Sequence, residues 1–191
     1  MKRLFDFSSA LFGLLLLWPL LLVIAIIIRI KMPDGPVLFR QKRVGQHGQL
    51  FTLVKFRTMS MHHNGSSISI AGESRITPIG AFLRKYKLDE LPELWNVLIG
   101  EMSFVGPRPD VPGYADKLQG EERRILELKP GITGPATLKY RNEEELLAAQ
   151  PDPQRYNDEV IYPDKVRINL DYLDNRTLRG DLNIILRTLI K

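Results

Sequence analysis

The sequence predicts an α+β protein, mostly helical, in which a membrane-associated helix precedes one small globular domain. Three observations support this fold class: a long apolar run near the N-terminus, amphipathic helical patterns, and two strand-like stretches joined by a glycine-containing turn. We expect residues 1–32 to form the membrane segment and residues 33–191, enough for one core, to form the globular domain.

The composition excludes several classes of protein. Apolar residues make up 44% of the chain and charged residues 26%, which are ordinary globular values and exclude a disordered or repeat-dominated chain. The absence of cysteine excludes disulfides, thiolate metal sites and a cysteine nucleophile. The net charge of +5 favours an anionic partner, either a membrane surface, a phosphorylated substrate or a nucleic acid. Since no nucleic-acid recognition motif is present, we expect no nucleic-acid partner.

The N-terminal run from Phe7 to Ile28 contains 22 residues without a formal charge. As a straight helix it would be roughly 33 Å long, about one hydrocarbon core. It is longer than the apolar region of a signal peptide, and Arg29 and Lys31 follow it in place of a cleavage site.

Two membrane topologies remain open on these grounds. Lys2 and Arg3 precede the run while Arg29 and Lys31 follow it, and basic flanks prefer the cytoplasmic side. A helix that enters and leaves by one face satisfies both flanks, and Pro19 near the middle favours such a bend. A spanning helix also tolerates proline.

The globular part begins with two strand-like stretches, residues 37–40 and 50–59, with a turn at residues 45–48. Lys55 and Arg57 fall on one face of the second stretch. Residues 61–73 are polar and rich in glycine and serine, which predicts a loop. We therefore expect His62 and His63 to be exposed and assign them no metal.

Amphipathic patterns predict the helices. Thr77 and Pro78 form a typical helix start. The apolar positions that follow are Ile79, Phe82, Leu83 and Tyr86. The interleaved basic residues suit either a membrane interface or a solvated face above a core. A second helix is expected over residues 91–99, starting near Asp89–Glu90 because of Pro92, and its apolar face comprises Leu91, Leu94, Trp95 and Leu98. Further helices are expected over residues 121–128 and 166–190, the latter with a break at Gly180.

Asp89 and Glu90 are the first candidate site residues. At the start of a helix, unpaired backbone donors and the dipole favour the ionised carboxylate. Such a group can attack phosphorus or bind a hard cation such as Mg²⁺. Ordinary helix capping is the competing interpretation.

The string Pro107-Arg108-Pro109 favours a functional role for Asp89 and Glu90 over simple helix capping. Two prolines restrain the backbone on both sides of one guanidinium, and arginine binds phosphate through two hydrogen bonds at once. Other cations that we expect to contribute to substrate binding are Lys55, Arg57, Arg75, Arg84 and Arg141.

With these residues the chain resembles the small monotopic phosphoglycosyl transferases of bacteria, the bacterial sugar transferase family. The matching strings occur in family order over nearly the whole chain. They are residues 2–7 (KRLFDF), 55–59 (KFRTM), 88–97 (LDELPELWNV), 102–109 (MSFVGPRP) and 129–134 (KPGITG).

The resemblance implies a re-entrant membrane helix broken at Pro19. Both chain ends would then lie in the cytoplasm, and residues 33–191 would form a catalytic domain on the cytoplasmic face of the bacterial inner membrane. Amphipathic helices would hold this domain at the interface.

The resemblance also implies an enzyme that transfers a phosphosugar from a UDP-sugar to a polyprenol phosphate, releasing UMP. Asp89 would be the nucleophile, Mg²⁺ would lie at Asp89 and Glu90, and Arg84 and Arg108 match family arginines. The sequence specifies neither the sugar nor the oligomeric state. A non-enzymatic membrane-anchored protein and a nucleotide-sugar hydrolase are the alternatives.

Two positions depart from the family pattern. The family often has serine before the breaking proline, where this chain has Trp18. After Gly134 the family commonly has tryptophan, where this chain has Pro135 and then an acidic stretch over residues 142–152. The first departure bears on the bend in the membrane helix, and the second suggests a subfamily with a different sugar.

Overall fold

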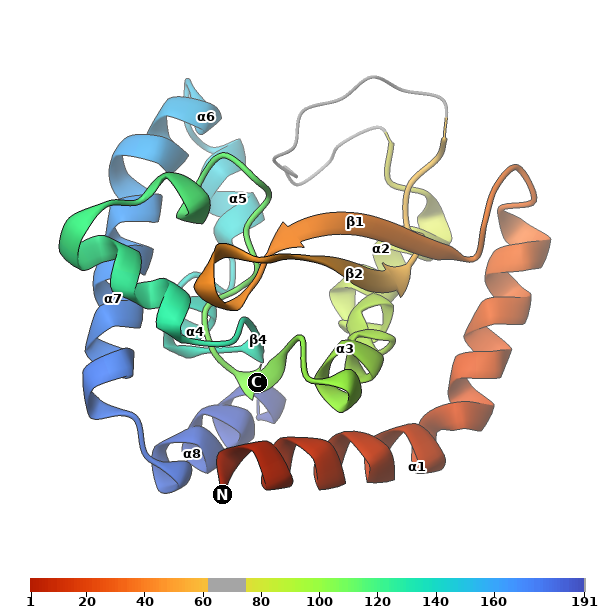
Figure 1. Ribbon diagram of the computed structural model, residues 1–191. Coiled ribbons are helices and arrows are strands. Elements are labelled where there is room, and N and C mark those ends of the chain that lie inside the picture. The colour runs from red at the N-terminus through yellow and green to blue at the C-terminus, as the bar shows by residue number, and fades with distance from the viewer. Residues whose placement is uncertain (62–74, 191) are drawn as a thin grey trace. The chain divides into compact units, whose positions relative to one another are not determined.

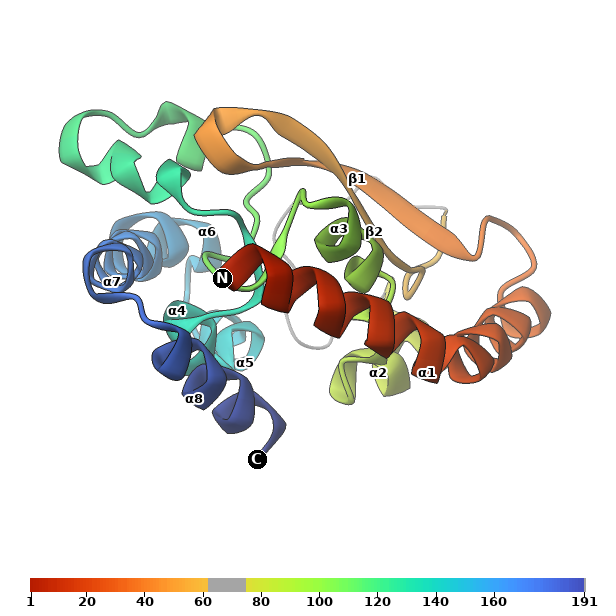
Figure 2. The same ribbon diagram turned by 60° about the horizontal axis from the view of Figure 1, so that its bottom comes forward.

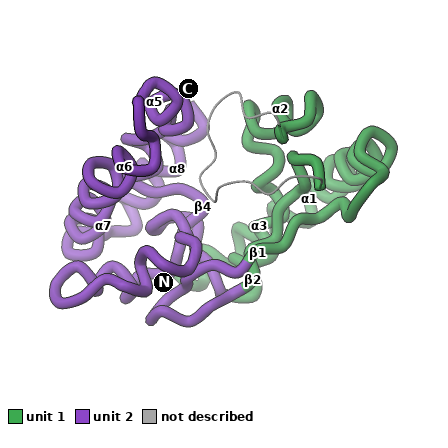
Figure 3. The backbone as a smooth tube through the Cα atoms, turned by 90° about the horizontal axis from the view of Figure 1, so that it is seen from above, with its two compact units in different colours: residues 1–41, 52–66, 72–100 green, residues 42–51, 67–71, 101–191 purple. Residues whose placement is uncertain are grey.

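The computed structural model describes residues 1–61 and 75–190 (Figure 1), so His62 and His63 lie outside the described residues. The chain forms two compact units, coloured separately in Figure 3. Among the described residues, the first unit contains 1–41, 52–61 and 75–100, and the second contains 42–51 and 101–190. The fold is α+β and mostly helical, as predicted.

Helix α1 (Lys2–Lys31) is apolar and long enough to cross a membrane, by length and composition. It changes direction midway along its length (Figure 1), and Pro19 is the one proline inside it. A proline lacks the backbone donor and clashes with the preceding turn, which accounts for the bend. Trp18 beside it is 60% exposed.

Both ends of α1 contact the same unit. Near its start, the Arg3 guanidinium donates hydrogen bonds of 2.6 and 2.7 Å to the carbonyls of Val97 and Leu98 in helix α3 (Glu93–Ile99). Helices α1 and α3 run alongside each other (Figure 2). Near its end, Ile24 and Ile28 of α1 enter a buried cluster that also contains Met32, Phe56 and Leu83.

The segment between α1 and α3 confirms one predicted helix start. Helix α2 (Pro78–Lys85) begins at Thr77, whose hydroxyl accepts a 3.0 Å hydrogen bond from the Gly80 amide. Within α2, Leu83 is buried in the core, whereas Phe82 and Tyr86 point outward with 52% and 57% of their surface exposed. The predicted apolar face of this helix is therefore divided between core and surface.

The prediction for the next helix was wrong in two respects. Residues Leu88–Glu90 form a separate 3-10 turn, and α3 begins only at Glu93. Its buried residues include Glu93 and Asn96, whereas Trp95 is 52% exposed. A simple apolar periodicity fails here because α3 contacts α1 on one side and strand β2 through Asn96 on another.

Strands β1 (Leu38–Val44) and β2 (Leu50–Phe56) pair as the predicted hairpin. The connection is the 3-10 turn Gln46–Gly48, in which His47 and Gly48 have positive φ angles of 58° and 79°. The hairpin contributes residues to both units.

The second unit contains a parallel strand pair that the sequence did not reveal. Strand β3 (Ser103–Val105) pairs with β4 (Gly131–Thr133) in the register Ser103 to Gly131. Three residues are too few to show a periodicity. The strands approach closely because the contact carries glycine: a Cβ at Gly131 would lie 2.1 Å from the Gly106 nitrogen.

The remaining elements of the second unit are mostly helical. They are the 3-10 helices Ala115–Lys117 and Gly120–Glu127, α4 (Pro135–Lys139), α5 (Glu143–Ala148), α6 (Pro153–Tyr156), the π-helical turn Asn157–Ile161, α7 (Tyr162–Asn175) and α8 (Leu178–Leu189). The expected helix over 121–128 is thus a 3-10 helix. The last two helices separate at Arg176–Thr177 and not at Gly180, because the Thr177 hydroxyl caps α8 by accepting from the Gly180 amide.

Candidate functional site

Asp89 occupies a strained turn and is almost completely buried. Lys87, two residues before Asp89, adopts a left-handed conformation with φ 56° after the end of α2. The Asp89 side chain is only 4% exposed, and among the described residues its Oδ1 atom has no hydrogen-bond partner. Native proteins rarely leave a buried carboxylate oxygen unpaired, so this atom is a strong candidate for a ligand or a reaction.

The electrostatics of Asp89 differ from the sequence-based expectation. Burial, followed by the neighbouring charge of Glu90, raises the pKa of Asp89, although Lys55, Lys87 and Arg84 oppose the shift. The expected stabilisation of the carboxylate by a helix start is absent because Asp89 precedes α3 by a full turn and loses hydration instead.

Lys55 and Arg84 are the predicted cations that the structure brings into electrostatic range of Asp89. Lys55 also lies 5.6 Å from the centroid of the Phe39 ring, which restricts its side chain to one region of the hairpin. A third cation, Lys87, joins them and was not predicted as a site residue. Three cations beside one carboxylate and Glu90 suit a phosphorylated ligand.

Arg57 is bonded to backbone carbonyls of the first unit. Its side chain is buried, and its guanidinium donates to the carbonyl of Met32 and, at 3.3 Å, to that of Gly35. These bonds join the segment that follows α1 to the residue that follows β2, so Arg57 supports the fold at this point. Arg75 lies at the edge of the described residues, where its carbonyl accepts from the Ser60 amide.

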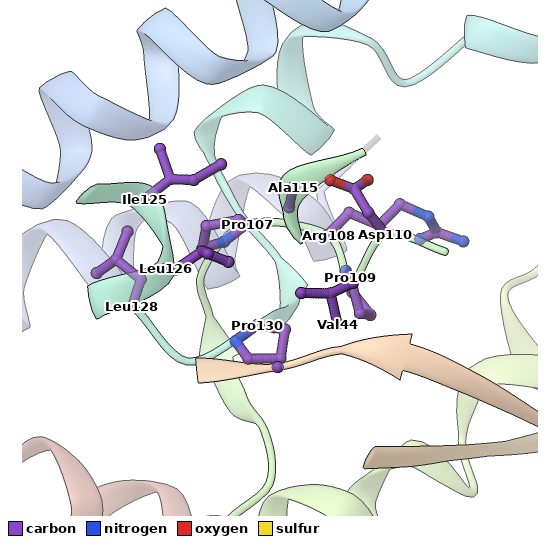
Figure 4. Close-up of a pocket in the computed structure, with 11 residues that line it drawn as sticks. Val44, Pro107, Arg108, Pro109, Asp110, Ala115, Ile125, Leu126, Leu128 and Pro130 are labelled. Carbon is purple, nitrogen blue, oxygen red and sulfur yellow. The ribbon is translucent and has the colours of Figure 1, made fainter. Parts of the chain in front are cut away.

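The two other predicted cations belong to the second unit. Arg108 is exposed and lines a small pocket with residues that include Val44, Pro107 and Pro130 (Figure 4). Arg141 donates a 2.7 Å hydrogen bond to the Arg187 carbonyl near the end of α8, which assigns it a helix-capping contact.

Asp110 was not among the predicted site residues, although it lies in the same pocket as Arg108. It follows the Pro-Arg-Pro string directly and also lines the pocket of Figure 4. Burial raises its pKa to about 6, even though Lys165 and a hydrogen bond from the Tyr162 hydroxyl favour the charged form. Its position two residues after Arg108 was the available signal in the sequence.

Several large apolar side chains of both units face outward. In the first unit they include Phe82, Tyr86 and Trp95, with the Phe82 and Tyr86 rings 5.0 Å apart. In the second unit the exposed face of α8 carries Leu178, Leu182, Leu186 and Leu189. Helix α8 packs on the core through Ile184 and Ile185. Exposed stripes of this kind are typical of interaction surfaces.

Comparison with known proteins identifies the family of this chain. The model of the bacterial sugar transferase family matches residues 1–191, the whole chain. The chain is 36% identical over 191 residues to the uncharacterized sugar transferase EpsL of Bacillus subtilis, covering 86% of that protein. It is 38% identical over 197 residues to the UDP-glucose:undecaprenyl-phosphate glucose-1-phosphate transferase of Xanthomonas campestris pv. campestris, and 32% identical over 205 residues to the undecaprenyl-phosphate galactose phosphotransferase of Salmonella typhimurium.

The coverage of these relatives differs. The whole chain aligns with the first two and 98% of it with the third, but it spans only 38% and 39% of the length of the last two relatives. The similarity nevertheless extends over both compact units, from α1 to α8. The chain belongs to the bacterial sugar transferase family.

Proposed function

We propose that this protein is an enzyme that transfers a phosphosugar from a UDP-sugar to undecaprenyl phosphate and releases UMP. This reaction would be the first membrane step in the assembly of a surface glycan. The named relatives from Xanthomonas and Salmonella are transferases of glucose 1-phosphate and galactose phosphate to undecaprenyl phosphate, which supports the substrate classes.

The observation that carries the proposal is the unbonded Oδ1 atom of Asp89 beside three cations. In the first displacement, a carboxylate oxygen of Asp89 attacks the phosphorus that bears the sugar. The bond from this phosphorus to the bridging oxygen breaks, and UMP leaves with that oxygen. The product is a mixed anhydride between the Asp89 carboxylate and the phosphosugar, in which the negative charge lies on the phosphate and no longer on the carboxylate.

In the second displacement, a phosphate oxygen of undecaprenyl phosphate attacks the same phosphorus and releases the Asp89 carboxylate. Two displacements at one site let a small protein serve a water-soluble donor and a lipid acceptor in turn. Lys55 and Arg84 lie close enough to Asp89 to compensate charge on the transferred phosphate.

Mg²⁺ is the cofactor that we propose, held by Asp89 and Glu90. The residues fit this ion because both donors are hard carboxylate oxygens and one of them, Asp89 Oδ1, is buried without a partner among the described residues. That part of the chain has no group of three or more His, Asp or Glu side chains arranged to hold a metal, and Mg²⁺ commonly binds through one or two carboxylates together with phosphate. When bound, it would offset charge on the diphosphate.

The membrane topology that we propose is re-entrant, with both ends of α1 and the catalytic domain on the cytoplasmic face. Arg3 near one end and Ile28 near the other contact the same compact unit. A helix that crossed the bilayer would separate these ends by roughly 30 Å of hydrocarbon. The exposed aromatic residues Phe82, Tyr86 and Trp95 suit the lipid–water interface, where such rings concentrate.

The test is UMP release by the purified full-length protein with a panel of UDP-sugars, Mg²⁺ and undecaprenyl phosphate. We expect release to depend on the lipid acceptor and to be lost in Asp89→Asn. UMP release at the full rate without the acceptor would establish a hydrolase instead. No release with any UDP-sugar would favour a non-enzymatic membrane protein. The panel also identifies the sugar, on which the relatives disagree.

A further inference from the structure

The residues on the N-terminal side of Arg108 are bonded to the β3–β4 pair. The Gly106 amide donates to the Thr133 carbonyl at 2.9 Å, and the Pro107 carbonyl accepts from the Gly131 amide at 2.8 Å. A Cβ at Gly106 would lie 2.2 Å from the Lys129 carbonyl oxygen, so the backbones pack directly on each other. Backbone hydrogen bonds to strand β4 therefore fix the main chain that precedes Arg108.

The residues on the C-terminal side are held by one backbone bond and by two side chains from β1 and the start of α7. The Asp110 carbonyl accepts from the Val44 amide at 2.9 Å, and the Arg43 guanidinium donates to the Pro109 carbonyl at 3.0 Å. The Tyr162 hydroxyl at the start of α7 donates to the Asp110 carboxylate at 3.2 Å. Arg43, on β1, and Tyr162 thus hold the segment that leaves Arg108.

We propose that Arg43 and Tyr162 are positioning residues for Arg108. This proposal rests on the proposed function, in which Arg108 binds the diphosphate of the UDP-sugar. The Arg108 side chain is exposed, and Figure 4 shows it on the side of the pocket away from Ile125, Leu126 and Leu128. A long side chain on a fixed backbone loses less freedom when it binds phosphate than one on a mobile loop. Pro107 and Pro109 restrain the backbone dihedral angles next to Arg108. The bonds from Arg43 and Tyr162 hold the segment against β1 and α7.

Tyr162 offers a specific variant because its ring and its hydroxyl have separate functions. The ring packs edge-on against Tyr114, with centroids 5.0 Å apart, and contacts the buried cluster around Val44 and Val166. Tyr162→Phe keeps this packing and removes only the hydrogen bond to Asp110. Tyr114→Phe is the matched control, since the Tyr114 hydroxyl bonds to Gln154 and Asp158 and not to the Arg108 segment.

The experiment is a double-mutant cycle on UMP release by the full-length protein. We expect Tyr162→Phe to lower kcat/KM for the UDP-sugar by about threefold to tenfold, the usual effect of one hydrogen bond, and Tyr114→Phe to change it less than about twofold. In an Arg108→Ala background, Tyr162→Phe should have almost no further effect. An equal loss in the wild-type and Arg108→Ala backgrounds would indicate a purely structural effect of the Tyr162 hydroxyl and would overturn the positioning role. No loss in the wild-type background would overturn it as well.

A second measurement does not depend on turnover. Hydrogen–deuterium exchange of peptides covering residues 104–112 should be faster in Tyr162→Phe than in Tyr114→Phe, because the segment opens more often without the Asp110 bond. Unchanged exchange would refute the restraint itself. If the wild type released no UMP while exchange responded as expected, the proposed function would have failed and the restraint on the segment would stand.

Discussion

Asn96 in α3 donates a 2.8 Å hydrogen bond from Nδ2 to the carbonyl of Thr52. Its Oδ1 atom accepts from the Val54 amide at 3.2 Å, so one side chain serves a donor and an acceptor of strand β2. Asn96 is 1% exposed, and these bonds join the helix after Asp89 to the strand that carries Lys55. The turn with the proposed nucleophile and its nearest strand are thereby connected through a buried amide.

Asn96→Ala should lower the free energy of unfolding by about 2–3 kcal/mol, because it leaves the Thr52 carbonyl and the Val54 amide without their partner. Chemical denaturation in detergent micelles measures this change. Asn175→Ala is the control, since Asn175 is exposed and bonds only within its own helix, to Asp171. Equal stability of the two variants would contradict the buried link.

The sequence predicted the elements whose signals are local. The hairpin turn, the Thr77 cap and the apolar run of α1 each depend on residues close together in the chain. It failed where long-range contacts decide the structure. The predicted apolar face of this helix did not include Asn96, and the bonds to the distant strand β2 make its burial favourable.

The candidate site shows the same division. The sequence motif located Asp89, but its burial and raised pKa depend on packing that the motif does not encode. The sequence did not indicate the bonds of Arg57 to the Met32 and Gly35 carbonyls, because backbone carbonyls carry no residue-specific signal.

Asp89→Asn should reduce UMP release by at least about a thousandfold, because an amide is a poor nucleophile toward phosphorus. Mass spectrometry of wild-type enzyme quenched during turnover should find a phosphosugar on the peptide that contains Asp89. Asp34→Asn, at an exposed position, serves as the control. A phosphosugar attached to any other residue would remove Asp89 from the nucleophile role.

Arg57→Lys should lower thermal stability while leaving KM for the UDP-sugar within about twofold of the wild-type value. Lysine lacks the planar set of donors that reaches the Met32 and Gly35 carbonyls together. The comparison is Arg40→Lys on the exposed part of β1, which should change neither quantity. A large increase in KM at unchanged stability would indicate that Arg57 binds the substrate.

Replacing Pro19 should alter the membrane topology. The chain has no cysteine, so Lys2→Cys introduces a single labelling site. In spheroplasts, a membrane-impermeant maleimide should leave this cysteine unlabelled until the membrane is permeabilised. Adding Pro19→Leu should increase labelling from outside, because an unbroken helix favours crossing the bilayer. Asp34→Cys should remain protected in both backgrounds, and labelling of the parent Lys2→Cys protein would indicate a spanning helix.

Asp110 should make stability depend on pH. Its pKa is raised from 3.8 to about 6 in the folded protein, so the folded state binds the proton more tightly than the unfolded state does. Wild-type stability should therefore fall as the pH rises from 4 to 6. Asp110→Asn should be more stable than wild type at pH 7, by up to about 2 kcal/mol, and equal to it near pH 3.5. Denaturation curves at both pH values measure this, with Asp34→Asn as the exposed control.

The parallel pairing of Ser103 with Gly131 has a consequence for biosynthesis. The Pro-Arg-Pro string lies just after β3, but the strand that fixes it emerges from the ribosome only after a further stretch of 3-10 helix has been made. The nascent chain therefore completes the membrane helix and the turn around Asp89 well before Arg108 acquires its final backbone. The N-terminal region can thus bind the bilayer before the segment around Arg108, which we propose to bind the diphosphate, has folded.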